Sequence, residues 1–289
     1  MKRLILYSPA KVNLYLKILD KRADGFHNLI TLFERIDLCD KITLTRRKDK
    51  QIKIICNHPL VPSGDSNLAF KAAELLKKDF PNKTGINIRI KKNIPPASGL
   101  GGGSSNAATV LLGLNRFWRL GLSKKKLLTY AKKLGCDVAF FIYELPFALG
   151  RQKGDRIIPL DIRNKFWHIL VVPHKTISTK SAYDLWEKNK IQNLTQEKKD
   201  VKIQVLALKQ NSLSLLGKTL FNSFEKISGK ICPDILEIRE KLKDLGITAI
   251  SVSGKGPAVF GIVTARKEAI RCKRQLKNKS RSVFVVRTL

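Results

Sequence analysis

The sequence predicts an α+β fold, in which strands and helices follow one another without a βαβ repeat of regular spacing. Apolar residues alternate with polar ones in several segments, as in half-buried strands, and recur at helical spacing in others, as in amphipathic helices. These segments intermix irregularly, so layers of strands and helices are favoured over a doubly wound sheet. The 289 residues, of which 43% are hydrophobic, suffice for one large domain or two modest ones.

The first half of the chain has several segments with strand character. These are residues 3–19, 28–45, 51–56 and 86–90. A helix is expected at LAFKAAELLKK, where Asp65, Ser66 and Asn67 offer a cap for its N-terminus. Further helices are expected at AATVLLGLNRFW and at KKKLLTYAKKLG, and Ser123 is placed to cap the second of them.

From about residue 156 the pattern restarts, and we place a domain boundary there, although no Gly/Ser or Pro linker marks it. The expected strands are IIPLD, WHILVVP, AISVSG, AVFGIV and VFVV. The expected helices are residues 179–189, 201–227, 233–245 and 266–277. The predicted organisation is an N-terminal domain of residues 1–155 and a C-terminal domain of residues 156–289.

The N-terminal segment, MKRLILYSPAKVNLYL, has the basic start and the apolar stretch of a secretory signal. Pro9, Lys11 and Asn13 interrupt that stretch and no small-residue cleavage site follows, so we interpret it as a buried strand. No apolar run is long enough to span a bilayer. The five cysteines are scattered, odd in number and without a CxxC motif, which argues against a disulfide framework or a zinc site. Reduced thiols in a cytoplasmic compartment are the simplest interpretation.

The formal net charge of +33 raises the question of nucleic acid. The lysines are spread over many predicted helices, and no interleaved aromatic residues or known nucleic-acid module accompany them. A lysine-rich proteome or the basic surface of a phosphate-handling enzyme would give the same charge. We therefore expect nonspecific adhesion to polyanions at low salt and no specific nucleic-acid partner.

The segment NIPPASGLGGGSSN, residues 93–106, is the most unusual in the chain. Its two prolines force a turn, and its four glycines let the backbone adopt positive φ and approach a ligand closely. Ser104, Ser105 and Asn106 are all good N-cap residues, so a helix is expected to begin there with free N–H groups and a positive dipole end. The segment predicts an anion site suited to phosphate, although a glycine cluster taken alone is as often only a flexible or tightly packed turn.

Two other phosphate motifs are absent. The nearest approach to a Walker loop is SLSLLGKT, residues 212–219, which has Ser in place of the first Gly and lies in a helix-like run. A dinucleotide fingerprint starting at Gly99 fails because Ser104 occupies the position of its last glycine.

Three ordered blocks resemble the motifs of the GHMP kinases. PPASGLGGGSSNAA, residues 95–108, is similar to their second motif. SPAKVNLYLKI at residues 8–18 and SVSGKGPAVFGI at residues 251–262 resemble their first and third motifs. The resemblance implies a two-domain α+β fold with the active site in the cleft between the domains, and ATP as the phosphoryl donor.

Two finer blocks resemble one branch of that family. They are KRADGFHNLITLFERIDLCD at residues 21–40 and GCDVAFF at residues 135–141. This branch phosphorylates the 2-hydroxyl of a cytidine-diphosphate-linked methylerythritol on the way to terpenoid precursors. The resemblance thus implies a small-molecule substrate, no membrane partner, and a monomer or weak homodimer.

The resemblance also implies roles for individual residues. Lys11 and Asp137 would form the catalytic pair, in which Asp137 accepts the proton of the attacking hydroxyl and Lys11 keeps Asp137 ionised. The ATP phosphates would lie on Pro96, Ala97, Ser98, Gly99, Leu100, Gly101, Gly102, Gly103, Ser104, Ser105 and Asn106. A hydroxyl of Ser104 or Ser105 would help to hold Mg²⁺, which keeps waters and borrows phosphate oxygens, so no dedicated metal site is named.

The residues expected to contact the substrate are Asn13, Phe26, His27, Tyr183, Gly254 and Gly256. A histidine edge with aromatic faces is how proteins commonly hold an unpaired base. Taken alone, Tyr183 is a core residue, His27 is a surface-turn histidine, and the loop of Gly254 and Gly256 is a tight hairpin turn.

The chain departs from the family pattern at several positions. Asn106 stands where Asp is usual, Lys255 where Ser or Ala is usual, and Phe26 where Tyr is usual. Ala139 replaces a Pro, and Gln152 to Asp155 stand near the usual GRGE. Two other functions stay open: a GHMP kinase acting on homoserine or mevalonate, and a basic nucleic-acid-binding protein on a kinase scaffold.

Overall fold

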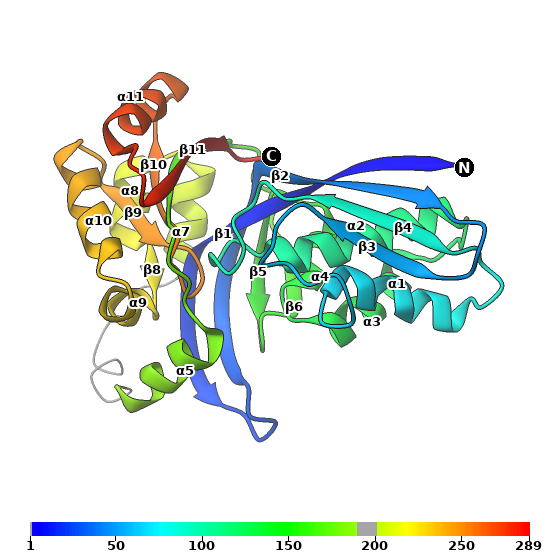
Figure 1. Ribbon diagram of the computed structural model, residues 1–289. Coiled ribbons are helices and arrows are strands. Elements are labelled where there is room, and N and C mark those ends of the chain that lie inside the picture. Colours follow the sequence, from blue (N-terminus) through cyan, green and yellow to red (C-terminus); the bar gives the residue numbers. More distant parts are fainter. Residues whose placement is uncertain (1, 190–200) are drawn as a thin grey trace.

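The computed structural model describes residues 2–189 and 201–289, which build two β-sheets with helices packed against them (Figure 1). Within these residues the larger sheet has seven strands in the order β3-β4-β2-β1-β8, with β5 paired to β2 and β6 paired to β5. Its strands are β1 (Arg3–Lys21), β2 (His27–Arg46), β3 (Ile52–Cys56), β4 (Ile86–Lys91), β5 (Phe147–Arg151), β6 (Arg156–Pro159) and β8 (Phe221–Asn222). The mixed α+β prediction is confirmed.

The smaller sheet is antiparallel and contains, in the same described ranges, four strands in the order β11-β7-β10-β9. They are β7 (Trp167–Pro173), β9 (Ala249–Val252), β10 (Val259–Val263) and β11 (Arg281–Arg287). The turn between β9 and β10 holds the third glycine block, which is thus a hairpin turn as well as a candidate binding loop.

Strands β1 and β2 form a long antiparallel hairpin that leaves the larger sheet and reaches α5 (Thr179–Lys188) (Figure 1). Its register shifts between Pro9 and Ala10 and again between Asn13 and Tyr15. Such irregularities bend a strand and re-aim its side chains. The two shifts flank Lys11 and Asn13, so they influence the direction in which these polar side chains leave the strand.

One face of the larger sheet is covered by helices (Figure 1). They are α1 (Leu68–Asp79), α2 (Gly102–Phe117), α3 (Lys124–Leu134) and α4 (Val138–Tyr143). Fully buried residues of the sheet, among them Ile42 and Ile88, pack into one core with Leu111 and Leu114 of α2. This apolar contact fixes the position of α2, and with it the glycine-rich segment that leads into the helix.

The second half of the chain adds helices around the smaller sheet. These are α5, α7 (Val201–Lys209), α8 (Leu213–Thr219), α9 (Glu225–Ile231), α10 (Asp234–Asp244) and α11 (Arg266–Leu276). A single apolar cluster joins Val12 and Leu14 of β1 to Leu170 of β7 and Phe260 of β10, so the two sheets share a core. The chain passes to the smaller sheet after β6 and returns to the larger one at β8, and the boundary near residue 155 stays a prediction.

The structure corrects two expected helices. Helix α2 begins at Gly102, with Gly101 at the N-cap, so Ser104, Ser105 and Asn106 lie inside its first turns. Gly101 has φ of 70°, which a glycine adopts at no steric cost, and this allows the helix to start before the serines.

The helix expected over 201–227 is divided into α7, α8 and α9. Asn211 has a positive φ of 54°, which ends the first piece, and Ser212 caps the second by accepting from the Leu215 amide. Strand β8 then pairs with β1 before α9 starts. The Walker-like run falls in α8, which agrees with its rejection as a phosphate loop.

Strand β5 was not expected from the sequence. None of the helices in the described part of the chain has the length and apolarity needed to cross a membrane.

Candidate active site

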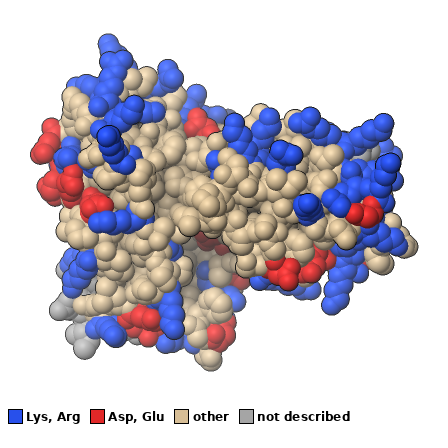
Figure 2. All heavy atoms as spheres, in the orientation of Figure 1, with Lys and Arg blue, Asp and Glu red and all other residues tan. Residues whose placement is uncertain are grey.

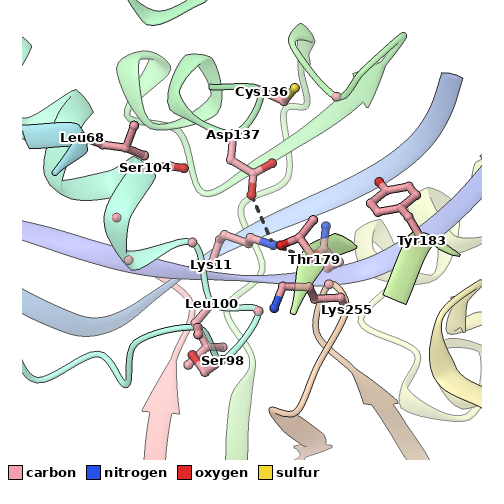
Figure 3. Close-up of a pocket in the computed structure, with 18 of the residues that line it drawn as sticks. Lys11, Leu68, Ser98, Leu100, Ser104, Cys136, Asp137, Thr179, Tyr183 and Lys255 are labelled. Atoms are coloured by element: carbon pink, nitrogen blue, oxygen red, sulfur yellow. Dashed lines mark hydrogen bonds and ion pairs between the residues drawn. The ribbon is translucent and has the colours of Figure 1, made fainter. Parts of the chain in front are cut away.

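A cavity of about 860 Å³ brings together segments that are far apart in the sequence (Figure 3). Its walls come from β1, the start of β2, the glycine-rich segment, the start of α4, helix α5 and the turn between β9 and β10. The three blocks that resemble kinase motifs therefore meet at one place.

Lys11 and Asp137 face one another across this cavity (Figure 3). The Lys11 Nζ lies 3.5 Å from Oδ2 of Asp137, and the lysine side chain is 4% exposed. Burial lowers the pKa of Lys11, while the charge and the hydrogen bond of Asp137 act in the opposite direction. Asp137 occupies the N-cap position of α4 without capping it and is 32% exposed, so its carboxylate remains available to a ligand.

Asn13 holds the lysine from the other side. Its Oδ1 accepts a hydrogen bond from the Lys11 ammonium, and its Nδ2 donates to Oγ1 of Thr31 at 2.7 Å. Thr31 in turn donates to the carbonyl of Tyr15 at 2.8 Å. This chain of bonds orients the amide of Asn13 and places it in the cavity wall, while its contact with substrate stays a prediction.

The glycine-rich segment wraps around Lys11. The amide of Lys11 donates to the carbonyl of Leu100 at 3.0 Å. A Cβ on Gly101 would lie 3.0 Å from Cγ of Lys11, so the lysine stem passes where only glycine leaves room. At the start of α2, the Ser105 amide donates to the Gly101 carbonyl at 2.9 Å. The preceding amides lie at the positive end of the helix, which suits a phosphate.

The predicted phosphate-binding residues line the cavity, with one exception. Ser104 faces it, whereas Ser105 is fully buried and its hydroxyl accepts from Ser8 at 2.7 Å. Ser104 is therefore the serine that can reach a metal ion or a phosphate. Asn106 contributes to the wall, and its amide donates to Ser8 and to Asp40 Oδ2, both at 2.9 Å.

The third block, at the turn between β9 and β10, is hydrogen-bonded to the glycine-rich segment of the second block. The hydroxyl of Ser253 donates to the carbonyl of Gly99 at 2.9 Å, and the amide of Ala258 donates to the carbonyl of Ser98 at 3.1 Å. Gly254 lines the cavity. Gly256, expected to contact substrate, does not line it; a Cβ there would meet the side chain of Val252 at 3.1 Å.

The remaining substrate candidates gather at the other end of the cavity. The ring of His27 stacks on Tyr183 with centroids 5.1 Å apart, and its Nε2 lies 3.2 Å from Oε1 of Glu187. Phe26 is 52% exposed, and the ammonium of Lys153 lies 4.7 Å from the centre of its ring. Burial raises the pKa of Tyr183 to about 12, so the phenol keeps its proton at neutral pH.

Two parts of the cavity wall were not predicted from the sequence. One is an apolar lobe formed by Leu60, Val61, Pro62 and Leu68, between β3 and the start of α1. The only signal for it was an apolar run inside a loop, with Leu60 left 68% exposed. The other is the polar face of α5, which no motif marks; it consists of Thr179, Lys180, Asp184 and Glu187.

Two family profiles match the chain. The GHMP kinases N terminal domain covers residues 67–144, and the GHMP kinases C terminal domain covers residues 205–281. Curated relatives align over nearly the whole chain, and the chain therefore belongs to the GHMP kinase family.

A relative from Geobacillus sp. (strain WCH70), named 4-diphosphocytidyl-2-C-methyl-D-erythritol kinase, is 38% identical over 287 residues, which are 99% of this chain and 97% of the relative. A protein of the same name from Alkaliphilus metalliredigens (strain QYMF) is 37% identical over 91% of this chain and 88% of its own length.

Solved structures agree with this family. A crystal structure of 4-(cytidine 5'-diphospho)-2C-methyl-D-erythritol kinase superimposes with a TM-score of 0.82 at 28% identity, covering 98% of this chain and 99% of the other. The mevalonate kinase of Methanococcus jannaschii reaches a TM-score of 0.76 at 18% identity, covering 99% of this chain and 98% of its own, and shares the fold.

Proposed function

We propose that this chain uses ATP to phosphorylate the 2-hydroxyl of 4-diphosphocytidyl-2-C-methyl-D-erythritol. The observation that carries the proposal is the pair of the buried Lys11 and the partly exposed Asp137, which faces the N-terminal end of α2 within one cavity. The relatives that match nearly the full chain supply the substrate.

In the proposed reaction, the oxygen of the acceptor hydroxyl bonds to the γ-phosphorus of ATP. The bond from that phosphorus to the β,γ-bridging oxygen breaks, and ADP leaves. Asp137 takes the hydroxyl proton, which a carboxylate facing the cavity can accept. Lys11 keeps Asp137 ionised and offers positive charge to the oxygens of the phosphoryl group.

The two ends of the cavity suit the two substrates. We place the adenine of ATP in the apolar lobe of Leu60, Val61, Pro62 and Leu68, and its phosphates on the amides at the start of α2. The cytosine of the acceptor lies at the opposite end, where Phe26, His27 and Tyr183 offer aromatic faces and a hydrogen-bonding edge.

Magnesium fits this arrangement as a partner of ATP. Among the described residues no cluster of three or more His, Cys, Asp or Glu could hold a metal, so the ion would depend on phosphate oxygens and the Ser104 hydroxyl. Bound there, Mg²⁺ supplies charge neutralisation for the β- and γ-phosphates. We also propose the cytoplasm as the compartment, since all five cysteines are free thiols.

The test is ADP release from ATP and Mg²⁺ with the cytidine-diphosphate-linked acceptor, comparing the wild type with Asp137→Asn. We expect turnover in the wild type and a loss of about 10²- to 10⁴-fold in the variant, because the amide cannot accept the proton. Asp161→Asn is the matched control, since the side chain of Asp161 is 87% exposed and does not line the cavity.

Two outcomes would redirect the assignment. Turnover with homoserine or mevalonate, but not with the cytidine-linked acceptor, would identify a different kinase of the family. Cytidine diphosphate should then also fail to compete. No turnover with any of the three acceptors from well-folded protein would leave a binding protein on a kinase scaffold.

A further inference from the structure

Lys255 occupies the tip of the turn between β9 and β10, between the glycines of the third block. Its side chain lines the cavity and lies beside Lys11 (Figure 3). Its ammonium donates to the backbone carbonyl of Ile177, just before the serine that caps α5. The position therefore lies between the phosphate-binding segment and the helix that carries Tyr183.

The charges around Lys255 are out of balance. Lys11 has Asp137 as its counter-ion. Within residues 2–189 and 201–289, no carboxylate forms an ion pair with Lys255, whose ammonium has only a neutral carbonyl as its partner. Burial, and then the charge of Lys11, lower the pKa of Lys255. Two neighbouring ammonium groups, of which only Lys11 has a carboxylate partner, leave a positive excess that favours an anion at this place.

The backbone of the turn is held by several hydrogen bonds, whereas the side chain of Lys255 is held by one, to the Ile177 carbonyl. The carbonyl of Lys255 accepts from the hydroxyl of Ser228 at 2.8 Å, and the Gly256 amide donates to the Ser253 carbonyl at 2.9 Å. Ser253 is itself bonded to the Gly99 carbonyl. A flexible four-carbon stem thus rises from a rigid base that is fastened to the phosphate-binding segment.

We propose that Lys255 is a second catalytic cation, whose ammonium exchanges the Ile177 carbonyl for an oxygen of the phosphoryl group during transfer. This inference rests on the proposed function. The bonds that form and break are those of that reaction, and the hydroxyl proton still goes to Asp137. Lys255 keeps its own proton and stabilises the negative charge spread over the oxygens of the transferred group.

The family pattern suggests an informative substitution at position 255. The family pattern has Ser or Ala at this position, so Lys255→Ser removes the cation and leaves a residue that the turn accommodates. We expect kcat to fall about 30-fold, less than the roughly 100- to 1,000-fold cost of a well-buried donor, because Lys255 is partly exposed. The KM for ATP should change less than about three-fold, since the contact forms mainly in the transition state.

Lys175→Ser is the matched control. Lys175 lies two residues before Ile177, is 61% exposed, pairs with Asp234 and does not line the cavity. It makes the same change of net charge, so an effect of charge alone would appear in both variants. Lys255→Arg keeps the cation and should recover part of the rate, while the restriction of the loss to kcat separates a catalytic role from a merely structural one.

The outcomes separate this inference from the proposed function. A wild type inactive on the cytidine-linked acceptor would reject the function. An active wild type, with Lys255→Ser within about two-fold of its kcat, would reject the role of Lys255. An equal loss in Lys175→Ser, or a loss confined to KM, would reject it as well. A fall in kcat restricted to Lys255→Ser and partly restored in Lys255→Arg is the result we expect.

Discussion

At the scale of single residues, Asn106 shows how a departure from the family pattern is accommodated. Its amide nitrogen donates to Oδ2 of Asp40, a fully buried carboxylate that also pairs with Lys92. The amides of Asn93 and Ile94 donate to the other oxygen of Asp40. A carboxylate at position 106 would place two negative groups side by side in this network, whereas the amide completes it. Asn106 therefore links the start of α2 to the buried Asp40 by a hydrogen bond.

Also at this scale, Lys11 gives a pH prediction. Burial lowers its pKa below the ordinary value of 10.5, so in the free protein it loses its proton at a lower pH than an exposed lysine. In the proposed reaction, the protonated form stabilises the phosphoryl oxygens. We therefore expect the alkaline limb of the kcat/KM profile to decline as pH rises through the lowered pKa of Lys11, still below pH 10.5.

The pH profile has an internal control. Bound phosphates favour the charged lysine, so the decline in kcat should occur at higher pH than the decline in kcat/KM. Because the pKa of Lys255 is also lowered, the profile is recorded in Lys255→Ser too, where the decline should persist. A decline only at or above pH 10.5 would contradict the prediction.

The same lowered pKa predicts that the unfolding free energy rises with pH, while activity falls. Between the lowered pKa and 10.5, the unfolded chain binds more protons at Lys11 than the folded chain does, so raising the pH stabilises the folded state there.

At the scale of elements, the two glycine blocks act as one unit. Gly99 has φ of 84°, and a Cβ on it would lie 2.1 Å from the carbonyl oxygen of Ser253. Gly99→Ala must therefore push the two blocks apart. Gly121 is the control, since it has φ of 67° and no heavy atom within 4 Å of the added Cβ.

We expect Gly121→Ala to lower the unfolding free energy by about 1–2 kcal/mol through backbone strain alone, with unchanged turnover. Gly99→Ala adds a steric clash and should cost about 1–3 kcal/mol more, and it should also slow turnover. Urea unfolding and ADP release measure the two effects. Equal stability losses in both variants, or full activity in Gly99→Ala, would show that the blocks are not coupled.

The elements also show what local sequence can predict. Strand alternation and helical spacing correctly predicted β1, β2, β4, α1 and α3, and Ser123 caps α3 as expected. The start of α2 was placed too late, because Ser104 and Ser105 are better caps by composition than Gly101. The backbone turn at Gly101 decided the outcome, and positive φ at a glycine leaves no mark in the side-chain pattern.

At the scale of the whole molecule, contacts between distant segments could not be predicted. His168 and Glu34 are both fully buried, with Nε2 of the histidine 2.9 Å from Oε1 of the glutamate, and Thr288 donates to the same oxygen at 2.5 Å. These residues come from β7, from β2 and from the segment after β11. Only the packing of the two sheets brings them together. The motifs that line the cavity could be predicted because each is a local sequence pattern. Its apolar lobe and the polar face of α5 could not be predicted, because no local pattern marks them.

The net charge of +33 belongs to the whole molecule and gives the last prediction. Lys and Arg side chains gather at both ends of the face seen in Figure 2, rather than along one continuous stripe. Dispersed Lys and Arg side chains bind the phosphates of a nucleic acid without recognising its sequence, and this binding releases counter-ions. Duplex DNA should therefore bind at low salt and lose about 10³- to 10⁵-fold in affinity between roughly 50 and 200 mM salt, if 6–10 phosphates are contacted. Fluorescence anisotropy of two unrelated duplexes measures this, and both should behave alike. Sequence-selective binding that survives about 150 mM salt would instead indicate a built nucleic-acid site, because a diffuse basic surface cannot resist screening at a Debye length of about 8 Å.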